Sequence, residues 1–343
     1  MRGAVRLLIV GALAAVTPAA LAPFTGSSSA SNSVTSDTDW MGPTVDRSVI
    51  AKTTGYLAGS VKPSGSYNVY ANITDSGNQA AGLSGGSAGA TADVQTVTVG
   101  QSSVLMTSTG GPWTVEGSTY NYRSSRPWTV TNPLTAGSKN YSIASTDAEG
   151  NASSTNFTVT VDNTGPNPTD IQTTNSSGGT PGGAETGDTI VFTFSERIDP
   201  YSILAGWAGS STNVIVRLHD GGCLLNLLIK VCSDDSFEVF NGASALATLG
   251  PVDLNDPDYV GGGLIGTAAD AVFGSTGTPS TMAQSGGSIT ITLGTRSGSN
   301  AGTGGSADTQ WNSASSPYDA AGNPPVATSR RRPAGAIGNS DPR

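Results

Sequence analysis

Four acidic residues carry the side chains best suited to a defined chemistry in this sequence, because carboxylate oxygens are the ligands that calcium prefers. Asp147 and Glu149 share one turn-like segment, while Asp162 and Asp170 lie on either side of a proline-rich break. Together they predict a calcium site at a junction between two folded units. The Asp-x-Asp-x-Asp-Gly pattern of a dedicated calcium loop is absent from the sequence.

Catalytic interpretations are weaker. A serine hydrolase needs a general base, and the one histidine of the chain, His219, stands beside Asp220 at the end of an expected strand. We interpret it as a surface histidine with polar partners. A glycosidase needs two carboxylates, but sandwich loops also use acidic residues for turns and solubility. The candidates for such a pair are Asp234, Asp235, Glu238, Asp253, Asp256 and Asp258. We expect no enzymatic activity.

Aromatic residues offer a second kind of binding surface, because their faces stack on the apolar faces of sugar rings. Core packing between strands is the alternative use, and aromatic residues are common there. The residues concerned are Trp113, Tyr120, Tyr122, Trp128 and Trp207.

Two cysteines, Cys223 and Cys232, are the only ones in the chain. In an exported protein they would form a disulfide, with a loop-closure contribution of roughly 2–3 kcal/mol. The alternative is a pair of free buried thiols. The intervening segment contains Leu224, Leu225, Leu227, Leu228 and Ile229, so the disulfide would fix a hydrophobic hairpin or loop at its base.

The N-terminus has the order of a secretory signal: Arg2 and Arg6 precede an apolar stretch that Pro18 interrupts. Cleavage before Ser31 or after Ala19 fits the small residues there. The net charge of −9 disfavours a nucleic-acid partner, since phosphate binding needs a clustered positive surface. No further apolar segment of spanning length occurs, which predicts a secreted or surface-associated protein without an integral anchor.

Period-two alternation predicts an all-β fold. With 46 glycines and 12% charged residues, the composition favours strands and turns over helices. In the first half, strands are expected at residues 67–74, 91–99, 103–107, 119–123, 128–131, 139–146 and 155–162. In the second half they are expected at residues 189–195, 213–219, 236–240 and 288–293. Seven short strands in about 120 residues suit a two-sheet sandwich.

Several motifs resemble bacterial immunoglobulin-like (Big-type) repeats of secreted or surface proteins. Residues 141–151 read YSIASTDAEGN, and residues 157–166 read FTVTVDNTGP, like the last hairpin and exit linker of such repeats. Residues 187–196 (GDTIVFTFSE) and 318–324 (YDAAGNP) are similar to the opening and closing of a second module. The two Asp-Ala-x-Gly-Asn turns form an internal echo. The leader is also similar to that of TasA-type matrix-fibre proteins.

The resemblance implies two tandem immunoglobulin-like sandwiches in a non-enzymatic, exported bacterial structural or adhesive protein. Its partners would be other extracellular components, glycans or further copies of itself. A carbohydrate-binding or matrix-fibre subunit is the alternative, and an exported hydrolase the third. The expected segments are a signal peptide (1–30), a flexible lead (31–44), two sandwiches (45–164 and 188–328), a linker (165–187) and a disordered tail (329–343).

Overall fold

The computed structural model describes residues 39–76, 82–85, 89–226, 229–242, 244–245, 249–260, 270–298, 302–305, 309–325 and 330–331. The expected signal peptide lies outside the described residues, as do the expected lead up to residue 38 and the expected tail apart from two residues. Residues from Asp39 onward form one compact unit by their contacts. No helix in the described ranges is long and apolar enough to cross a bilayer.

The fold is all-β and sandwich-like, as the composition predicts. Residues 39–161 form what we call the N-terminal sandwich. Its described strands are β1 (Thr44–Lys52), β2 (Ser60–Val61), β3 (Ser66–Thr74), β4 (Ala90–Asp93), β5 (Val104–Thr107), β6 (Trp113–Val115), β7 (Ser118–Tyr120), β8 (Tyr122–Ser124), β9 (Trp128–Thr129), β10 (Gly137–Thr146) and β11 (Ala152–Val161). They pair in the order β1-β3-β8-β5-β4-β10-β11-β2, with β9 on β3 and β6–β7 as a separate hairpin.

Burial explains why these strands fold together. The ten-residue pairing of β10 with β11 brings Tyr141 opposite Phe157, with ring centroids 5.7 Å apart. Strand β1 packs near β10 and β11, so the two ends of the pairing order approach each other. The core between them contains Ile50, Tyr67 and Ile143, all fully buried. Removing this apolar surface from water is the main force that holds the sandwich together.

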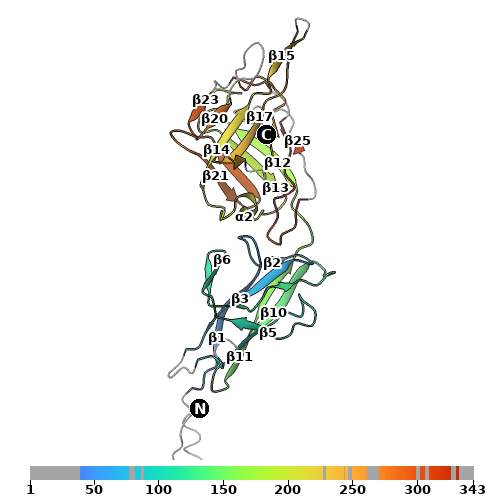
Figure 1. The fold of residues 1–343 in the computed structure, drawn as a ribbon, viewed down its shortest axis with the longest axis vertical. Helices are drawn as coiled ribbons and strands as arrows, with labels where there is room; N and C mark the ends of the chain where they lie inside the picture. Colours follow the sequence, from blue (N-terminus) through green and yellow to red (C-terminus); the bar gives the residue numbers. More distant parts are fainter. Residues whose placement is uncertain are drawn as a thin grey trace, which may run out of the picture. The chain divides into compact units, whose positions relative to one another are not determined.

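Residues 168–331 form the C-terminal sandwich. Its described elements are β12 (Pro168–Thr174), β13 (Thr189–Phe194), α2 (Pro200–Ile203), β14 (Thr212–His219), β15 (Cys223–Asn226), β16 (Ile229–Cys232), β17 (Ser236–Asn241), β18 (Ser244–Ala245), β19 (Val252–Asp253), β20 (Ala271–Phe273), β21 (Ser280–Ser285), β22 (Ser288–Thr292), β23 (Arg296–Gly298), β24 (Gln310–Trp311) and β25 (Arg330–Arg331). Figure 1 shows β13, β14, β17 and β21 grouped in this part of the chain.

A second, separate hydrophobic core holds this sandwich. The main sheet runs β12-β13-β22-β21-β14-β17-β19-β24-β25. Trp311 is fully buried in this core, with the rings of Phe192 and Phe194 each 5.0 Å away in edge-on contact. Its indole nitrogen donates to the Leu249 carbonyl at 2.7 Å, so the buried polar group is paired. The buried residues of the C-terminal sandwich thus form a cluster separate from the main core of the N-terminal sandwich.

The structure differs from the expected segments at three places. The expected linker contains β12, which pairs with β13 from Pro168 to Thr174. The expected lead ends in the first residue of β1, a strand that the alternation does not indicate because Asp46 and Arg47 interrupt it at a bulge. Arg330 and Arg331 of the expected disordered tail pair with β24.

Candidate metal centre

The two Asp-Ala-x-Gly-Asn turns adopt the same hydrogen-bonding pattern. In the first, the Asn151 backbone N–H donates to Asp147 Oδ1 and its side-chain amide to Asp147 Oδ2, both at 2.7 Å. In the second, Asn323 makes the same two bonds to Asp319 at 2.8 and 2.9 Å. The motif that is repeated in the sequence therefore also repeats its hydrogen bonds in the structure.

Each turn also holds the segment that enters its own sandwich. The Asn151 side-chain amide donates to the backbone carbonyl of Asp39 at 3.2 Å. The Asn323 amide donates to the carbonyl of Asp162 at 3.1 Å. Asp39 precedes β1, and Asp162 precedes β12, so the two aspartates occupy equivalent positions before the first strand of each sandwich.

These bonds bring three carboxylates together at the entry end of each sandwich. The first cluster is Asp39, Asp75 and Asp147, and the second is Asp162, Glu196 and Asp319. Within each cluster one oxygen of every carboxylate lies within 4.8 Å of the others. Asp75 follows β3 and Glu196 follows β13, the strands that pair with β1 and β12. Three oxygen donors at this spacing suit a hard cation such as calcium.

The four residues predicted from the sequence do not form one site. Asp147 and Asp162 lie at opposite ends of β11 and belong to different clusters. Glu149 is exposed at the turn, and Asp170 accepts a hydrogen bond from the Gln172 side chain at 2.8 Å. Neither joins a described cluster.

Sequence reasoning missed four members of the clusters, for which the echoed turns were the available signal. The second turn indicates an acidic residue equivalent to Asp147, and the entry segments indicate the rest by position. The residues missed are Asp39, Asp75, Glu196 and Asp319.

The first cluster contains a buried oxygen without a partner. Asp75 Oδ1 is shielded from solvent and accepts no hydrogen bond among the described residues, while Asp75 Oδ2 accepts one from the Gly82 N–H at 2.6 Å. Burial alone would raise the pKa of Asp147, but hydrogen bonds from Asn151, Gly150 and Glu149 lower it below its usual value. Asp147 is thus held as a carboxylate, the form that binds metal.

In the second cluster the negative charges of the three carboxylates repel one another. Burial, together with the neighbouring carboxylates of Asp319 and Asp162, raises the pKa of Glu196 to about 7. A carboxylate that takes up a proton this easily lacks a counter-charge, and a bound cation would supply one.

We expect Glu196→Gln to stabilise the calcium-free protein at about pH 8. The raised pKa means that the folded state holds the Glu196 proton more tightly than the unfolded state, whose glutamate titrates at about 4.3. Ionisation of Glu196 therefore lowers the free energy of unfolding by its full amount above about pH 7. This loss of stability becomes smaller as the pH falls from about 7 to about 4.3. Thermal unfolding with a chelator at about pH 8 and about pH 4 measures the effect, with Glu149→Gln as the exposed control. A variant no more stable than wild type at the higher pH would contradict it.

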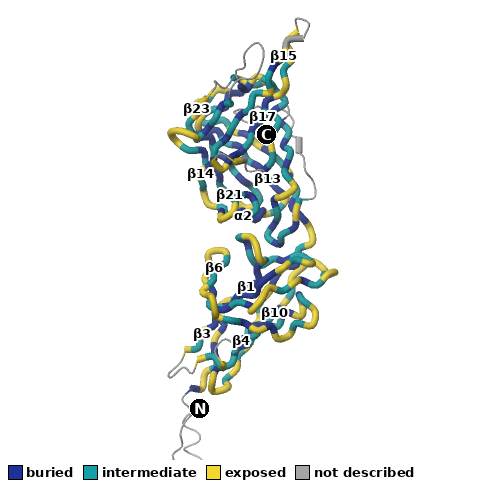
Figure 2. The backbone as a smooth tube through the Cα atoms, viewed as in Figure 1, coloured by how far each residue is buried: buried dark blue, intermediate teal, exposed yellow. Residues whose placement is uncertain are grey.

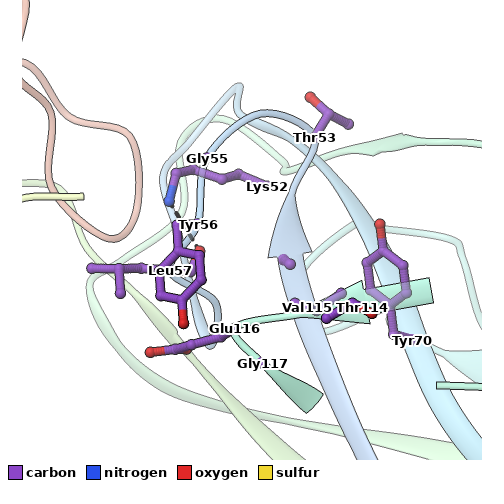
Figure 3. A pocket seen from close by; sticks show the side chains of 11 residues that line it. Lys52, Thr53, Gly55, Tyr56, Leu57, Tyr70, Thr114, Val115, Glu116 and Gly117 are labelled. Carbon is purple, nitrogen blue, oxygen red and sulfur yellow. Dashed lines mark hydrogen bonds between the residues drawn. The ribbon is translucent and has the colours of Figure 1, made fainter. Parts of the chain in front are cut away.

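A buried ion pair lies beside the second cluster. Lys52 Nζ is 2.5 Å from Asp199 Oδ2, and the Asp199 side chain is fully buried. Burial lowers the pKa of Lys52, an effect that the Asp199 carboxylate opposes. The same amino group donates to the Leu57 carbonyl at 3.0 Å (Figure 3) and to the Ala320 carbonyl at 2.8 Å. Lys52 thus links β1 of the N-terminal sandwich to the second Asp-Ala-x-Gly-Asn turn.

Further contacts surround this pair. Asp199 accepts the backbone N–H groups of Tyr56 and Leu57 at 3.0 and 3.1 Å, and Lys62 donates to the Gly322 carbonyl. A pocket of about 250 Å³, whose lining side chains include Lys52 and Tyr56, opens next to them (Figure 3). Its lining mixes polar and apolar residues, and Glu116 is the one carboxylate among them.

The other candidate residues have structural uses. His219 Nδ1 lies 3.0 Å from Asp270 Oδ1, as expected of a histidine with polar partners. Asp235 is fully buried and accepts the N–H groups of Gly221 and Val260, so it shapes loops. Tyr120, Tyr122 and Trp207 are buried. Arginines stack on the two half-buried tryptophans, Arg123 on Trp113 at 4.9 Å and Arg126 on Trp128 at 3.9 Å.

Residues 85–89 read GGSAG and match the Gly-x-Ser-x-Gly pattern of a serine nucleophile, but residues 86–88 lie outside the described part of the chain. The single histidine belongs to the other sandwich.

Comparison with known proteins gives no family. No family model matches the chain, and no curated protein matches it. Among solved structures, the dimeric latent PorU from Porphyromonas gingivalis is similar over 75% of this chain and 20% of that chain, with 14% sequence identity and a TM-score of 0.21. A likeness at that score carries no argument about fold or function.

Proposed function

We propose that this chain is an exported, non-enzymatic bacterial surface or extracellular protein in which two immunoglobulin-like modules form a calcium-stiffened structural or adhesive spacer. The observation that carries the proposal is the recurrence of one acidic cluster at the entry end of each sandwich. A repeated end geometry suits modules arranged in tandem, since each junction then presents the same ligands.

The sandwich order supports immunoglobulin-like modules. In each sandwich the first strand pairs antiparallel with the next long strand, β1 with β3 and β12 with β13. Each then closes with an Asp-Ala-x-Gly-Asn turn that binds the entering segment. Two separate cores fit modules that once folded as independent units.

The donor sets support calcium. All six side chains offer carboxylate oxygens and none offers nitrogen or sulfur, which favours a hard cation over zinc. Asp75 Oδ1 accepts no hydrogen bond from the described residues, and the pKa of Glu196 is raised, so a bound cation would supply the missing positive charge at both places. An exported setting makes calcium accessible to both clusters.

Contacts at the junction support a stiff connection. Lys52 and Lys62 of the N-terminal sandwich bind carbonyls of the turn at residues 319–323. Asp162, from the segment between the sandwiches, belongs to the second cluster. A cation there would bind the connecting segment to the C-terminal sandwich, so bending would require breaking its coordination.

Spin-label distances test the spacer role. Val99→Cys and Thr276→Cys place labels at exposed sites, one in each sandwich. A stiff spacer gives one narrow distance distribution with calcium and a broader one with a chelator. Labels at Val99 and Leu105, both within the N-terminal sandwich, serve as the control that calcium leaves unchanged. A broad distribution in both conditions would contradict the spacer function.

A further inference from the structure

The disulfide hairpin β15–β16 is an unusual feature of the C-terminal sandwich. Cys223 pairs with Cys232 at its base and forms the disulfide, and Leu224 pairs with Val231 one step further along. Its two strands form a sheet of their own and pair with no other described strand. Figure 1 shows β15 standing clear of the neighbouring strands of its sandwich. The disulfide thus holds a projecting hairpin in one register.

One face of this hairpin is apolar and open to solvent. Leu224 is 70% exposed, Ile229 66% and Val231 55%. Since side chains alternate along a strand, the register places Leu224, Val231 and Ile229 on the same face, opposite the disulfide. Figure 2 marks the hairpin as largely exposed. A contiguous exposed apolar face on a hairpin that pairs with no other described strand indicates an interaction surface.

The size of this face argues against a second protein as its partner. The three side chains expose roughly 300 Å². Two copies meeting through it would bury about 600 Å², and a specific protein interface needs about 1,200 Å². A lipid bilayer requires no matching surface, and an apolar area of this size is comparable to one acyl chain, which binds membranes weakly and reversibly.

Charge on the hairpin points the same way. Lys230 is the one charged residue between the two cysteines, and it is exposed. The register places it on the face of the disulfide, so it adds no charge to the face that carries Leu224, Ile229 and Val231. The net charge of −9 on the whole chain opposes attraction to anionic lipid, so the apolar face must supply the binding.

We propose that the β15–β16 hairpin binds lipid bilayers by inserting Leu224, Ile229 and Val231 into the boundary between headgroups and acyl chains. This goes beyond the spacer function, because it assigns a peripheral membrane contact to one loop. It is also independent of the calcium clusters, whose residues lie elsewhere in the chain.

Vesicle co-sedimentation of the full chain tests the proposal. The probes are vesicles of phosphatidylcholine and vesicles in which a third of the lipid is phosphatidylglycerol, both with a chelator present. Wild type is expected to bind phosphatidylcholine with a partition constant on the order of 10⁴ M⁻¹. The triple variant L224S/I229S/V231S is expected to bind at least about tenfold more weakly, since it loses the inserted apolar area.

The matched control is Val99→Ser, which removes a side chain that is 72% exposed in the N-terminal sandwich. It should bind like wild type, and anionic lipid should not strengthen binding. All variants lie at exposed positions, so circular dichroism should confirm unchanged folding. Equal binding by wild type and the triple variant would overturn the proposal. The proposal would also be overturned if wild type did not bind phosphatidylcholine vesicles and instead self-associated through the hairpin in sedimentation equilibrium.

Discussion

Replacing Asp199 by alanine is expected to destabilise the protein by about 3–5 kcal/mol. The change leaves the Lys52 ammonium buried without its counter-charge, and Lys52 is only 9% exposed in its side chain. It also removes the acceptor for the Tyr56 and Leu57 N–H groups and for the Tyr201 N–H that begins α2. Breaking a buried pair on one side costs more than the pair contributes, because the remaining charge stays desolvated.

Urea unfolding with a double-mutant cycle measures this effect. Lys52→Met removes the other charge, and the K52M/D199A double variant should be more stable than the sum of the single losses predicts. Arg197→Gln is the matched control, since it breaks the exposed pair with Glu116 at 3.3 Å and should cost less than about 1 kcal/mol. A loss in D199A no larger than that of R197Q would show that the ion pair does not hold the junction.

Calcium is expected to stabilise the chain by about 2.7 kcal/mol for each occupied site at a hundredfold excess over the dissociation constant. The stabilisation arises because the clusters assemble only in the folded state. Asp147→Asn should remove the increment of the first cluster and Asp319→Asn that of the second, each leaving the other intact. Both substitutions keep the shape of the side chain and one acceptor oxygen, while the second oxygen, which accepts from the Asn151 or Asn323 group, is replaced by a donor. The resulting loss of stability is present with and without calcium, so the calcium-dependent increment is compared within each variant.

Thermal unfolding with and without millimolar calcium measures these increments. Asp170→Asn is the control, since Asp170 belongs to neither described cluster. Its carboxylate accepts a hydrogen bond from the Gln172 side chain. It should retain the full calcium-dependent shift. A shift that survives in the double variant D147N/D319N would place the calcium elsewhere in the chain.

Strands with clean alternation could be predicted from the sequence. The apolar residues of β13 and β22, among them Ile190, Phe192 and Ile289, are buried as their period predicts. The hairpin between the two cysteines and its disulfide are confirmed. The hairpin has its partner strand close in the sequence. Strand β13 pairs with the distant β22, so its buried face was predictable from its own alternation and not from its partner.

Strands at the edges of the sheets were harder to predict. Strand β12 begins at Pro168, which fits the first residue of an edge strand but reads as a break in the sequence. Strand β1 carries a bulge between Val45 and Arg47, which shifts the alternation by one residue. Both strands are stabilised by pairing with a neighbouring strand, and their own residue patterns do not clearly indicate a strand.

The candidate metal site was predicted in part. Asp147 and Asp162 are cluster members, and the repeated turn indicates a second cluster. Their partners come from far along the chain, for example Asp39 with Asp147 and Asp162 with Asp319. Such groupings follow from the pairing of strands in three dimensions, whereas nearness in the sequence suggested Glu149 and Asp170, which belong to neither described cluster.

Isothermal titration with calcium measures whether the two carboxylate clusters bind the ion. The two clusters predict two calcium ions per chain, falling to one in D147N and to one in D319N, with none bound by the double variant. Binding should also weaken as the pH falls below about 7, because Glu196 then takes up a proton. Absence of binding heat in wild type at about pH 8, or a stoichiometry that neither substitution changes, would contradict the account.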